Sequence, residues 1–253
     1  MRPGLPVQIE RSGRPCAKSF AFRAHSGYFG IVNSEESFQN LIRFLFGDVR
    51  VDMWIDVDEI RLPEPVQKEV SAGHAVDALY QFDMLASPRG KLWYLTRRTA
   101  EEDSVACMTH RQWTEEREKY RSQHMSTVFL ANRARVNTRR KSLAYSMTLG
   151  VRVPDYEIDR KLWINEHYEG SYLFRGTIIF EMTPPANGDS NWKLHAQWTG
   201  TAAPVDDKDI DVRTLSGRAI EITIPFENPG KPGIRGRLRL VASLWNEDAG
   251  LDG

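Results

Sequence analysis

Hydrophobic residues recur at helical spacing between Asn33 and Gly47, early in the chain. Asn33 and Ser34 are both suited to an N-cap, and Glu36 follows Asn33 by three residues, as in a capping box. Gly47 stands where a left-handed C-terminal cap is expected. The pattern therefore predicts an amphipathic helix. Its apolar face holds Phe38, Leu41, Ile42, Leu45 and Phe46.

Beyond this helix the pattern changes to alternation with a period of two, which is typical of half-buried strands. The first such run is 51–57, and a polar, proline-containing connection follows at 61–75. A charged stretch at 111–124 suits either a short helix or a loop. The further strand candidates are 76–86, 91–98, 104–110, 126–136, 143–153, 171–182, 192–198, 218–226 and 236–245. The predicted fold is mainly β, an antiparallel β-sandwich or barrel preceded by a short strand (18–24), a loop and the helix.

Composition excludes several classes of function. Lys+Arg and Asp+Glu are equal at 34 each, so no net field draws the protein to nucleic acid or to an anionic membrane. Cys16 and Cys107 are too few for a disulfide framework and are expected to be unpaired thiols in a reducing compartment. No apolar stretch suits a signal peptide or a transmembrane segment. We expect a soluble, cytoplasmic protein without a cofactor.

His25 is the candidate catalytic residue, because it lies in a glycine-bearing loop between the predicted strand 18–24 and the helix. A loop at the carboxyl end of a strand can direct an imidazole at a serine hydroxyl. Imidazole accepts and returns a proton near neutral pH, as a general base must. The alternative is an ordinary loop histidine beside a packed helix, which is what a lone histidine usually is.

The segment AHSGYFGIVNSEESFQNLIRFLFGD, residues 24–48, resembles the C-terminal part of bacterial esterases and lipases of the α/β-hydrolase family. In that family a histidine followed by Ser or Gly leads through a small apolar stretch to a capped helix with an NLxRFLFG-like pattern. The resemblance implies that His25 is the general base of a serine hydrolase. It also implies two domains, with residues 1–50 as the C-terminal remnant of a hydrolase domain and residues 51–253 as an appended β-sandwich.

The nucleophile motif of that family, G-x-S-x-G, occurs nowhere in the sequence. Ser26 adjoins His25, but neighbours in one loop seldom adopt the geometry of a catalytic pair. The resemblance therefore implies that an upstream hydrolase segment or a partner chain supplies the serine, that the substrate is a carboxylic ester or lipid, and that this chain alone is inactive. The alternative is a non-catalytic β-sandwich that binds a partner and packs its helix on one sheet.

Two charged stripes are candidate ion sites. The acidic stripe comprises Asp52, Asp56, Asp58 and Glu59, and the basic stripe comprises Arg235, Arg237 and Arg239. The first stripe could hold a hard cation, but we expect a solvated strand face that protects a sheet edge. The second could meet phosphate or a lipid head group, but the balanced net charge favours local neutralisation.

Several aromatic residues and histidines complete the set of candidates. The aromatic residues in the middle of the predicted sandwich are Trp163, Tyr168, Tyr172, Trp192 and Trp198. We expect aromatics on the strand face of Leu194 in the core, whereas exposed ones in the loop 159–174 would mark a binding patch. Neither His167 nor His195 has a second ligand at metal spacing, so no metal site is expected.

Overall fold

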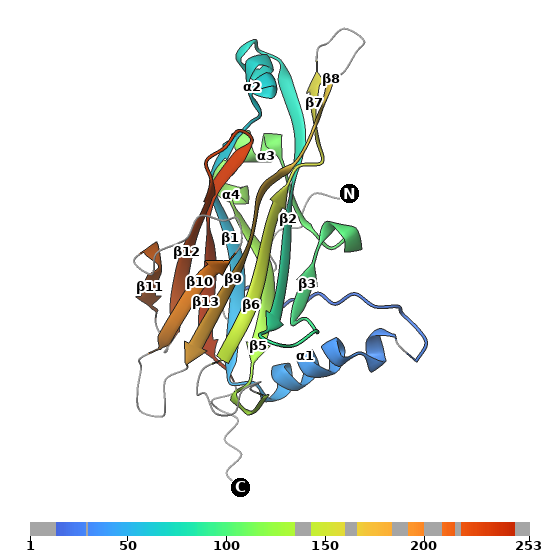
Figure 1. Ribbon diagram of the computed structural model, residues 1–253, viewed down its shortest axis with the longest axis vertical. Coiled ribbons are helices and arrows are strands. Elements are labelled where there is room, and N and C mark those ends of the chain that lie inside the picture. Colours follow the sequence, from blue (N-terminus) through green and yellow to red (C-terminus); the bar gives the residue numbers. More distant parts are fainter. Residues whose placement is uncertain are drawn as a thin grey trace.

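Two antiparallel β-sheets pack face to face in an elongated molecule (Figure 1). The structure, a computed structural model, describes most of the chain between Arg14 and Trp245. The described ranges are 14–28, 30–134, 143–159, 166–183, 192–199, 209–215 and 219–245. The chain is thus mainly β with antiparallel sheets, as the alternating pattern predicts.

The first sheet has five strands in the order β11-β12-β13-β1-β5. Its strands are β1 (Val49–Arg61), β5 (Ser122–Leu130), β11 (Asp211–Thr214), β12 (Ile220–Asn228) and β13 (Gly233–Leu244). Strand β1 lies in the interior of this sheet, between β13 and β5, rather than at an edge.

The second sheet has eight strands, with β10-β9-β6-β2-β7-β8 as its path and β3 and β4 paired to β2. Its strands are β2 (Ala75–Pro88), β3 (Thr96–Arg98), β4 (Ala106–Thr109), β6 (Leu143–Arg152), β7 (Asp155–Asp159), β8 (Glu166–Glu169), β9 (Tyr172–Thr183) and β10 (Lys193–Thr199). The long strand β2 pairs with four others, and so it organises this sheet. The short strands β7, β8 and β11 were not among the predicted strands.

One hydrophobic core fills the space between the sheets. The Phe174 ring of β9 lies 5.4 Å from the Trp198 ring of β10 and 4.7 Å from the Phe226 ring of β12. Trp198 Nε1 also donates to the carbonyl oxygen of Pro225, 3.2 Å away, so a polar bond joins the sheets inside an apolar core. Two sheets that share one core make a sandwich rather than a closed barrel.

Helices lie at the ends and edges of the sandwich (Figure 1). They are α1 (Glu35–Phe46), α2 (Glu64–Ser71), α3 (His110–Glu115) and α4 (Arg117–Tyr120), with 3₁₀ turns η1 (Ile31–Asn33), η2 (Ala100–Glu102) and η3 (Asn132–Ala134). Helix α1 is the predicted amphipathic helix. The polar connection 61–75 contains α2, and the charged stretch is helical, since it forms α3 and α4.

Two local predictions near α1 are wrong. Residues 18–24 run extended but form no strand, because their backbone bonds are scattered over different neighbours instead of one ladder. Gly47 is not left-handed, since its φ is −77° and its ψ 160°. Glycine is needed there for space, because a Cβ would lie 2.2 Å from the carbonyl oxygen of Arg43. The proposed boundary after residue 50 stays a prediction, and β1 begins at Val49.

Candidate functional site

His25 lies near the start of a closed loop that precedes α1. The Ile31 N–H donates to the carbonyl oxygen of Ala24 at 2.8 Å, and the Gly30 N–H donates to that of Gly27 at 3.0 Å. Gly27 has a φ of +92°, a left-handed conformation that favours glycine. The imidazole is exposed and forms no hydrogen bond or ion pair within the described ranges. The loop therefore leaves the ring open to a group from outside.

The first turn of α1 is fixed to the segment that precedes the loop. Ser34 is the N-cap, and its Oγ accepts from the Ser37 N–H at 3.2 Å. Arg23 donates to Glu36 Oε1 at 2.8 Å, so the ends of the loop are joined by an ion pair. Burial alone would raise the pKa of Glu36, but the hydrogen bonds that it accepts and the charges of Arg23 and Arg97 together lower that pKa. The His25 loop is thus closed by side chains as well as by backbone.

Helix α1 turns a polar side toward the sandwich. Arg43 is 2% exposed, and its guanidinium carbon lies 4.8 Å from the centre of the Trp93 ring. Asn40 Nδ2 donates to the carbonyl oxygen of Tyr94 at 3.4 Å. A cation over an aromatic face and buried polar bonds hold this side of the helix.

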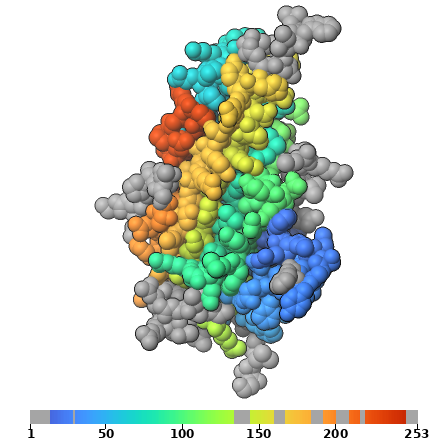
Figure 2. Space-filling view, turned by 45° about the vertical axis from the view of Figure 1, so that its right-hand side comes forward, coloured from blue at the N-terminus to red at the C-terminus, as the bar shows by residue number. Residues whose placement is uncertain are grey.

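The apolar side of the same helix faces solvent. Phe38 is 56% exposed, Leu41 55%, Leu45 48% and Phe46 60%. Further exposed apolar residues lie in the same segment before α1. The α1 apolar surface is defined here as Phe22, Tyr28, Val32, Phe38, Leu41, Leu45 and Phe46. This segment forms a projection at the side of the sandwich, seen in blue in Figure 2. A concentrated exposed apolar patch on a folded protein marks an interaction site.

The C-terminal end of α1 is anchored by aromatic residues. Trp245 Nε1 donates to the carbonyl oxygen of Phe44 at 2.8 Å, which satisfies a terminal carbonyl of the helix. The Phe129 ring lies 5.2 Å from Phe44 and 4.9 Å from Trp245. The last turn of α1 is therefore fixed to the ends of β5 and β13.

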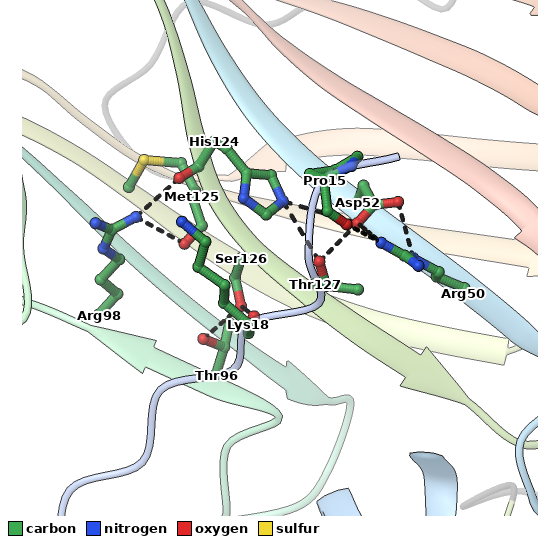
Figure 3. Close-up of polar contacts among 10 residues, drawn as sticks. All are labelled: Pro15, Lys18, Arg50, Asp52, Thr96, Arg98, His124, Met125, Ser126 and Thr127. Carbon is green, nitrogen blue, oxygen red and sulfur yellow. Dashed lines mark hydrogen bonds and ion pairs between the residues drawn. The ribbon is translucent and has the colours of Figure 1, made fainter. Parts of the chain in front are cut away.

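The segment before the loop is anchored on β5 and β3. The carbonyl oxygen of Lys18 accepts from Ser126 Oγ at 2.9 Å and from the Thr127 N–H at 2.6 Å (Figure 3). The carbonyl oxygen of Phe20 accepts from the Arg97 N–H at 2.8 Å. Arg98 covers the Phe20 ring at 4.5 Å. These contacts fix the chain only a few residues before His25.

A buried network on β1 and β5 superficially resembles a hydrolytic triad (Figure 3). Asp52 accepts from Thr127 Oγ1 at 2.6 Å and from Arg50 Nε at 3.0 Å, and its Oδ1 lies 3.7 Å from His124 Nε2. The hydroxyl therefore donates to the carboxylate, not to the imidazole, which is the wrong direction for nucleophile activation. Thr127 is also 1% exposed, so no substrate reaches it. The network is structural.

The charges in this network are set by burial and by hydrogen bonds. Burial tends to raise the pKa of Asp52, but hydrogen bonds from His124, Thr127 and Arg50 hold it below its ordinary value. Burial lowers the pKa of His124, which favours a neutral imidazole. Burial also lowers the pKa of Arg98 to about 10, which leaves its guanidinium charged at neutral pH.

Three residues of the acidic stripe pair with the basic stripe, whereas Asp52 pairs with Arg50. Asp56 accepts from Arg239 at 2.6 Å, and Asp58 accepts from Arg237 at 2.9 Å. Glu59 lies 3.4 Å from Arg235. The expectation of local neutralisation is confirmed, whereas edge protection is wrong because β1 lies between two other strands.

The structure gathers possible metal ligands around His167. Its Nδ1 lies 3.8 Å from Asp155 Oδ2 and 3.7 Å from Glu157 Oε1, across the β7–β8 pair. Sequence spacing gave no hint of these neighbours. Exposed acidic groups commonly gather without an ion, and no other feature here points to one. The predicted Trp163 lies outside the described residues.

Neither thiol belongs to a site. Cys16 and Cys107 form no disulfide, as expected from their number. Burial raises the pKa of Cys107, which disfavours the reactive thiolate.

The comparisons add no relative. No protein-family model, curated protein or solved structure matches the chain. Among the described residues, no helix has the length and apolar character required to cross a bilayer. His25 can be singled out from the sequence, whereas the role of Arg43 cannot. The one sequence signal for that role was Arg43 itself, the single basic residue among the apolar positions of the last helical turns.

Proposed function

We propose that this chain is the C-terminal part of a serine esterase or lipase of the α/β-hydrolase type, with His25 as general base. The serine nucleophile would come from a hydrolase segment outside these 253 residues or from a partner chain. The substrate would be a carboxylic ester, and the two-sheet sandwich would be an accessory domain.

The orientation of α1 is the observation that carries this proposal. A helix that belongs only to the sandwich would bury its apolar side, because that burial is what stabilises an amphipathic helix. Here Leu41 and Leu45 face outward while Arg43 faces the sandwich. The resemblance indicates that a hydrolase domain covers this apolar side, since the last helix of an α/β hydrolase packs its apolar side on the hydrolase sheet. The exposed His25 would lie at the edge of the same interface.

The chemistry asked of His25 is the transfer of one proton in two directions. The serine Oγ attacks the ester carbonyl while the imidazole accepts the hydroxyl proton. The tetrahedral intermediate then expels the alkoxide, which leaves as the alcohol after it receives that proton from the imidazolium. Water repeats both steps on the acyl-serine, releasing the carboxylic acid and restoring the hydroxyl. Closure of the loop by Arg23 and Glu36 would hold the imidazole in place during both transfers.

An esterase assay with a short p-nitrophenyl ester tests the proposal. We expect no turnover by the 253-residue chain and clear turnover by a form extended at the N-terminus with the sequence encoded immediately upstream. In the extended form, His25→Ala should lower kcat by about 10⁶-fold, as loss of the histidine of a catalytic triad does. His195→Ala is the matched control, because it removes another exposed imidazole, on β10. Turnover that survives His25→Ala would exclude this residue from the mechanism.

A second test addresses the α1 apolar surface directly. Leu41→Glu should leave the unfolding midpoint of the chain alone unchanged, because this side chain is 55% exposed. In the extended form the same change should abolish turnover and destabilise the hydrolase domain, because it places a charge in the interface. If the extended form tolerates Leu41→Glu, the surface serves something else. Sedimentation of the chain with phosphatidylcholine vesicles would then favour the alternative, a sandwich that binds a lipid surface.

A further inference from the structure

A hollow of about 300 Å³ lies on the outward face of the eight-stranded sheet, beside η2 and the segment that leads into β3. Its floor is a row of three residues on neighbouring strands. Asp83 of β2 is opposite Gly150 of β6, and Gly150 is opposite Arg175 of β9. We name this hollow the Asp83 pocket. Its features are independent of the proposed hydrolase function.

Gly150 leaves a gap between two opposite charges. Neighbouring strands are about 4.8 Å apart, so the strands of Asp83 and Arg175 are separated by about 10 Å, and Gly150 contributes no side chain to the space between them. A Cβ on Gly150 would lie 3.4 Å from Asp83 Cβ and 3.4 Å from Tyr172 Cε1. Glycine inside a strand often marks a place where a ligand approaches the backbone closely.

Asp83 is a buried carboxylate, and one of its two oxygens accepts a hydrogen bond from the backbone. It is 7% exposed, and its Oδ1 accepts from the Ala100 N–H at 2.9 Å. Its Oδ2 is the oxygen near Gly150, 3.5 Å from where a Cβ would lie. Within the described ranges Asp83 forms no ion pair, and burial raises its pKa. The charges of Arg152 and Arg175 act in the opposite direction but do not outweigh the cost of burying the carboxylate.

Two tyrosines contribute to the walls of the pocket, each beside an arginine. The guanidinium carbon of Arg175 lies 5.1 Å from the Tyr172 ring, and that of Arg97 lies 5.6 Å from the Tyr94 ring. Tyr172 is 37% exposed and lies at the start of β9. The pocket thus combines apolar ring surface with hydrogen-bond donors and acceptors, as ligand sites do.

The balance of charge selects the class of ligand. Asp83 and Glu101 oppose Arg97 and Arg175 around the pocket, so the formal charge of this lining is zero and a charged ligand gains no net attraction. A hydroxyl is a neutral group that both donates to a carboxylate and accepts from a guanidinium, and a sugar ring carries several of them. The volume is at the lower end of ligand pockets, which allows one ring. We propose that the Asp83 pocket binds one sugar ring, either a neutral monosaccharide or the terminal sugar of a glycoside.

The hollow on the other sheet lacks these properties. It encloses about 460 Å³ near β1, β12 and β13, and its charged residues bind one another. Asp56, for example, accepts from Arg239 at 2.6 Å and from Ser122 at 2.5 Å. Its carboxylates and guanidiniums are therefore already satisfied, and nothing in it calls for a ligand.

The test measures the binding of methyl glycosides to the 253-residue chain by saturation-transfer NMR and by calorimetry. The probes are methyl glucopyranoside, galactopyranoside and mannopyranoside. We expect saturable binding of at least one. Asp83→Asn and Gly150→Ala should each weaken it by about tenfold or more, the first by removing a charged acceptor and the second by filling the gap. Asp77→Asn is the matched control, because Asp77 is an exposed acid on the same strand, outside the pocket.

The folding of each variant is checked by its melting temperature. Gly150→Ala should fold, because the added Cβ makes contacts of 3.4–3.5 Å, which are ordinary van der Waals distances. Tyr172→Ala is a further variant at a partly exposed wall and should also weaken binding. The proposal is overturned if no glycoside binds saturably. It is also overturned if both pocket variants bind as the parent does, or if a zwitterion such as L-alanine binds there in preference.

Discussion

The guanidinium of Arg43 lies over the ring of Trp93, 4.8 Å from its centre, and holds the polar side of helix α1 on the sandwich. Leu41 and Leu45 of the same helix are consequently about half exposed. A cation and an indole thus occupy the interface that aliphatic side chains normally fill. The orientation of α1 depends on this contact, and it is the basis of the proposed hydrolase interface.

Arg43→Ala should destabilise the chain more than Leu41→Ala, although leucine is the more hydrophobic residue. Removing Arg43 deletes a buried aliphatic stem and a cation–π contact, together worth about 2 kcal/mol. Leu41 is 55% exposed and loses little on truncation. Urea denaturation measures both free energies of unfolding. The opposite order would show that α1 buries its apolar side in solution.

Asp52→Ala should cost about 3–5 kcal/mol at neutral pH, because Arg50 remains 1% exposed without its counter-charge. The pKa of Asp52 is lowered in the folded state, so its contribution is complete above the ordinary value of 3.8 and is lost as pH falls below it. Unfolding measured from pH 7 to pH 3 should show that the parent loses this advantage over the variant. Asp58→Ala, which breaks a more exposed pair with Arg237, should cost about 1 kcal/mol or less.

Asp83→Asn should raise the free energy of unfolding at neutral pH, on the order of 1 kcal/mol, because it removes a buried charge that has no ion-pair partner. The pKa of Asp83 is raised in the folded state, so its ionisation destabilises the fold at neutral pH. This penalty disappears as pH falls through the folded pKa toward 3.8, where parent and variant should converge. Melting temperatures at several pH values test this. A destabilised variant would show that the carboxylate supports the fold.

Cys107 should resist thiol reagents in the native protein, because it is 7% exposed and burial raises its pKa. Titration with Ellman's reagent at pH 8 should label Cys16, which is only partly buried, and reach Cys107 only in denaturant. Cys107→Ser should leave the native labelling unchanged. Rapid labelling of both thiols would show that the edge formed by β4 opens readily.

Local patterns predicted which elements form, but not what they face. The spacing of Phe38, Leu41 and Leu45 identified α1 and its apolar side correctly, because helical periodicity is a property of neighbouring residues. The outward orientation of this side depends on the contact between Arg43 and Trp93, which are 50 positions apart in the sequence. Alternation predicted most strands, whereas the short β7, β8 and β11 carry too few residues for a pattern.

The candidate sites show the same limit more strongly. His25 was found because a loop histidine beside a capped helix is a local feature. The pairing of Asp56 with Arg239 joins residues 183 positions apart, and it depends on strand register that a single sequence does not reveal. The Asp83 pocket depends on the registers of three strands at once, and these registers are not visible in a single sequence. Nothing in the sequence therefore distinguishes Gly150 from any other small residue in a strand.

The loop that carries His25 is fixed on both sides. Phe20 is bonded to Arg97 before it, and Phe44 is bonded to Trp245 after it. A segment held at two points samples few positions, so little orientational entropy remains to be lost when a reaction partner arrives. The backbone at His25 is therefore held beside the sandwich, and the exposed ring keeps only the rotations about its own side-chain bonds.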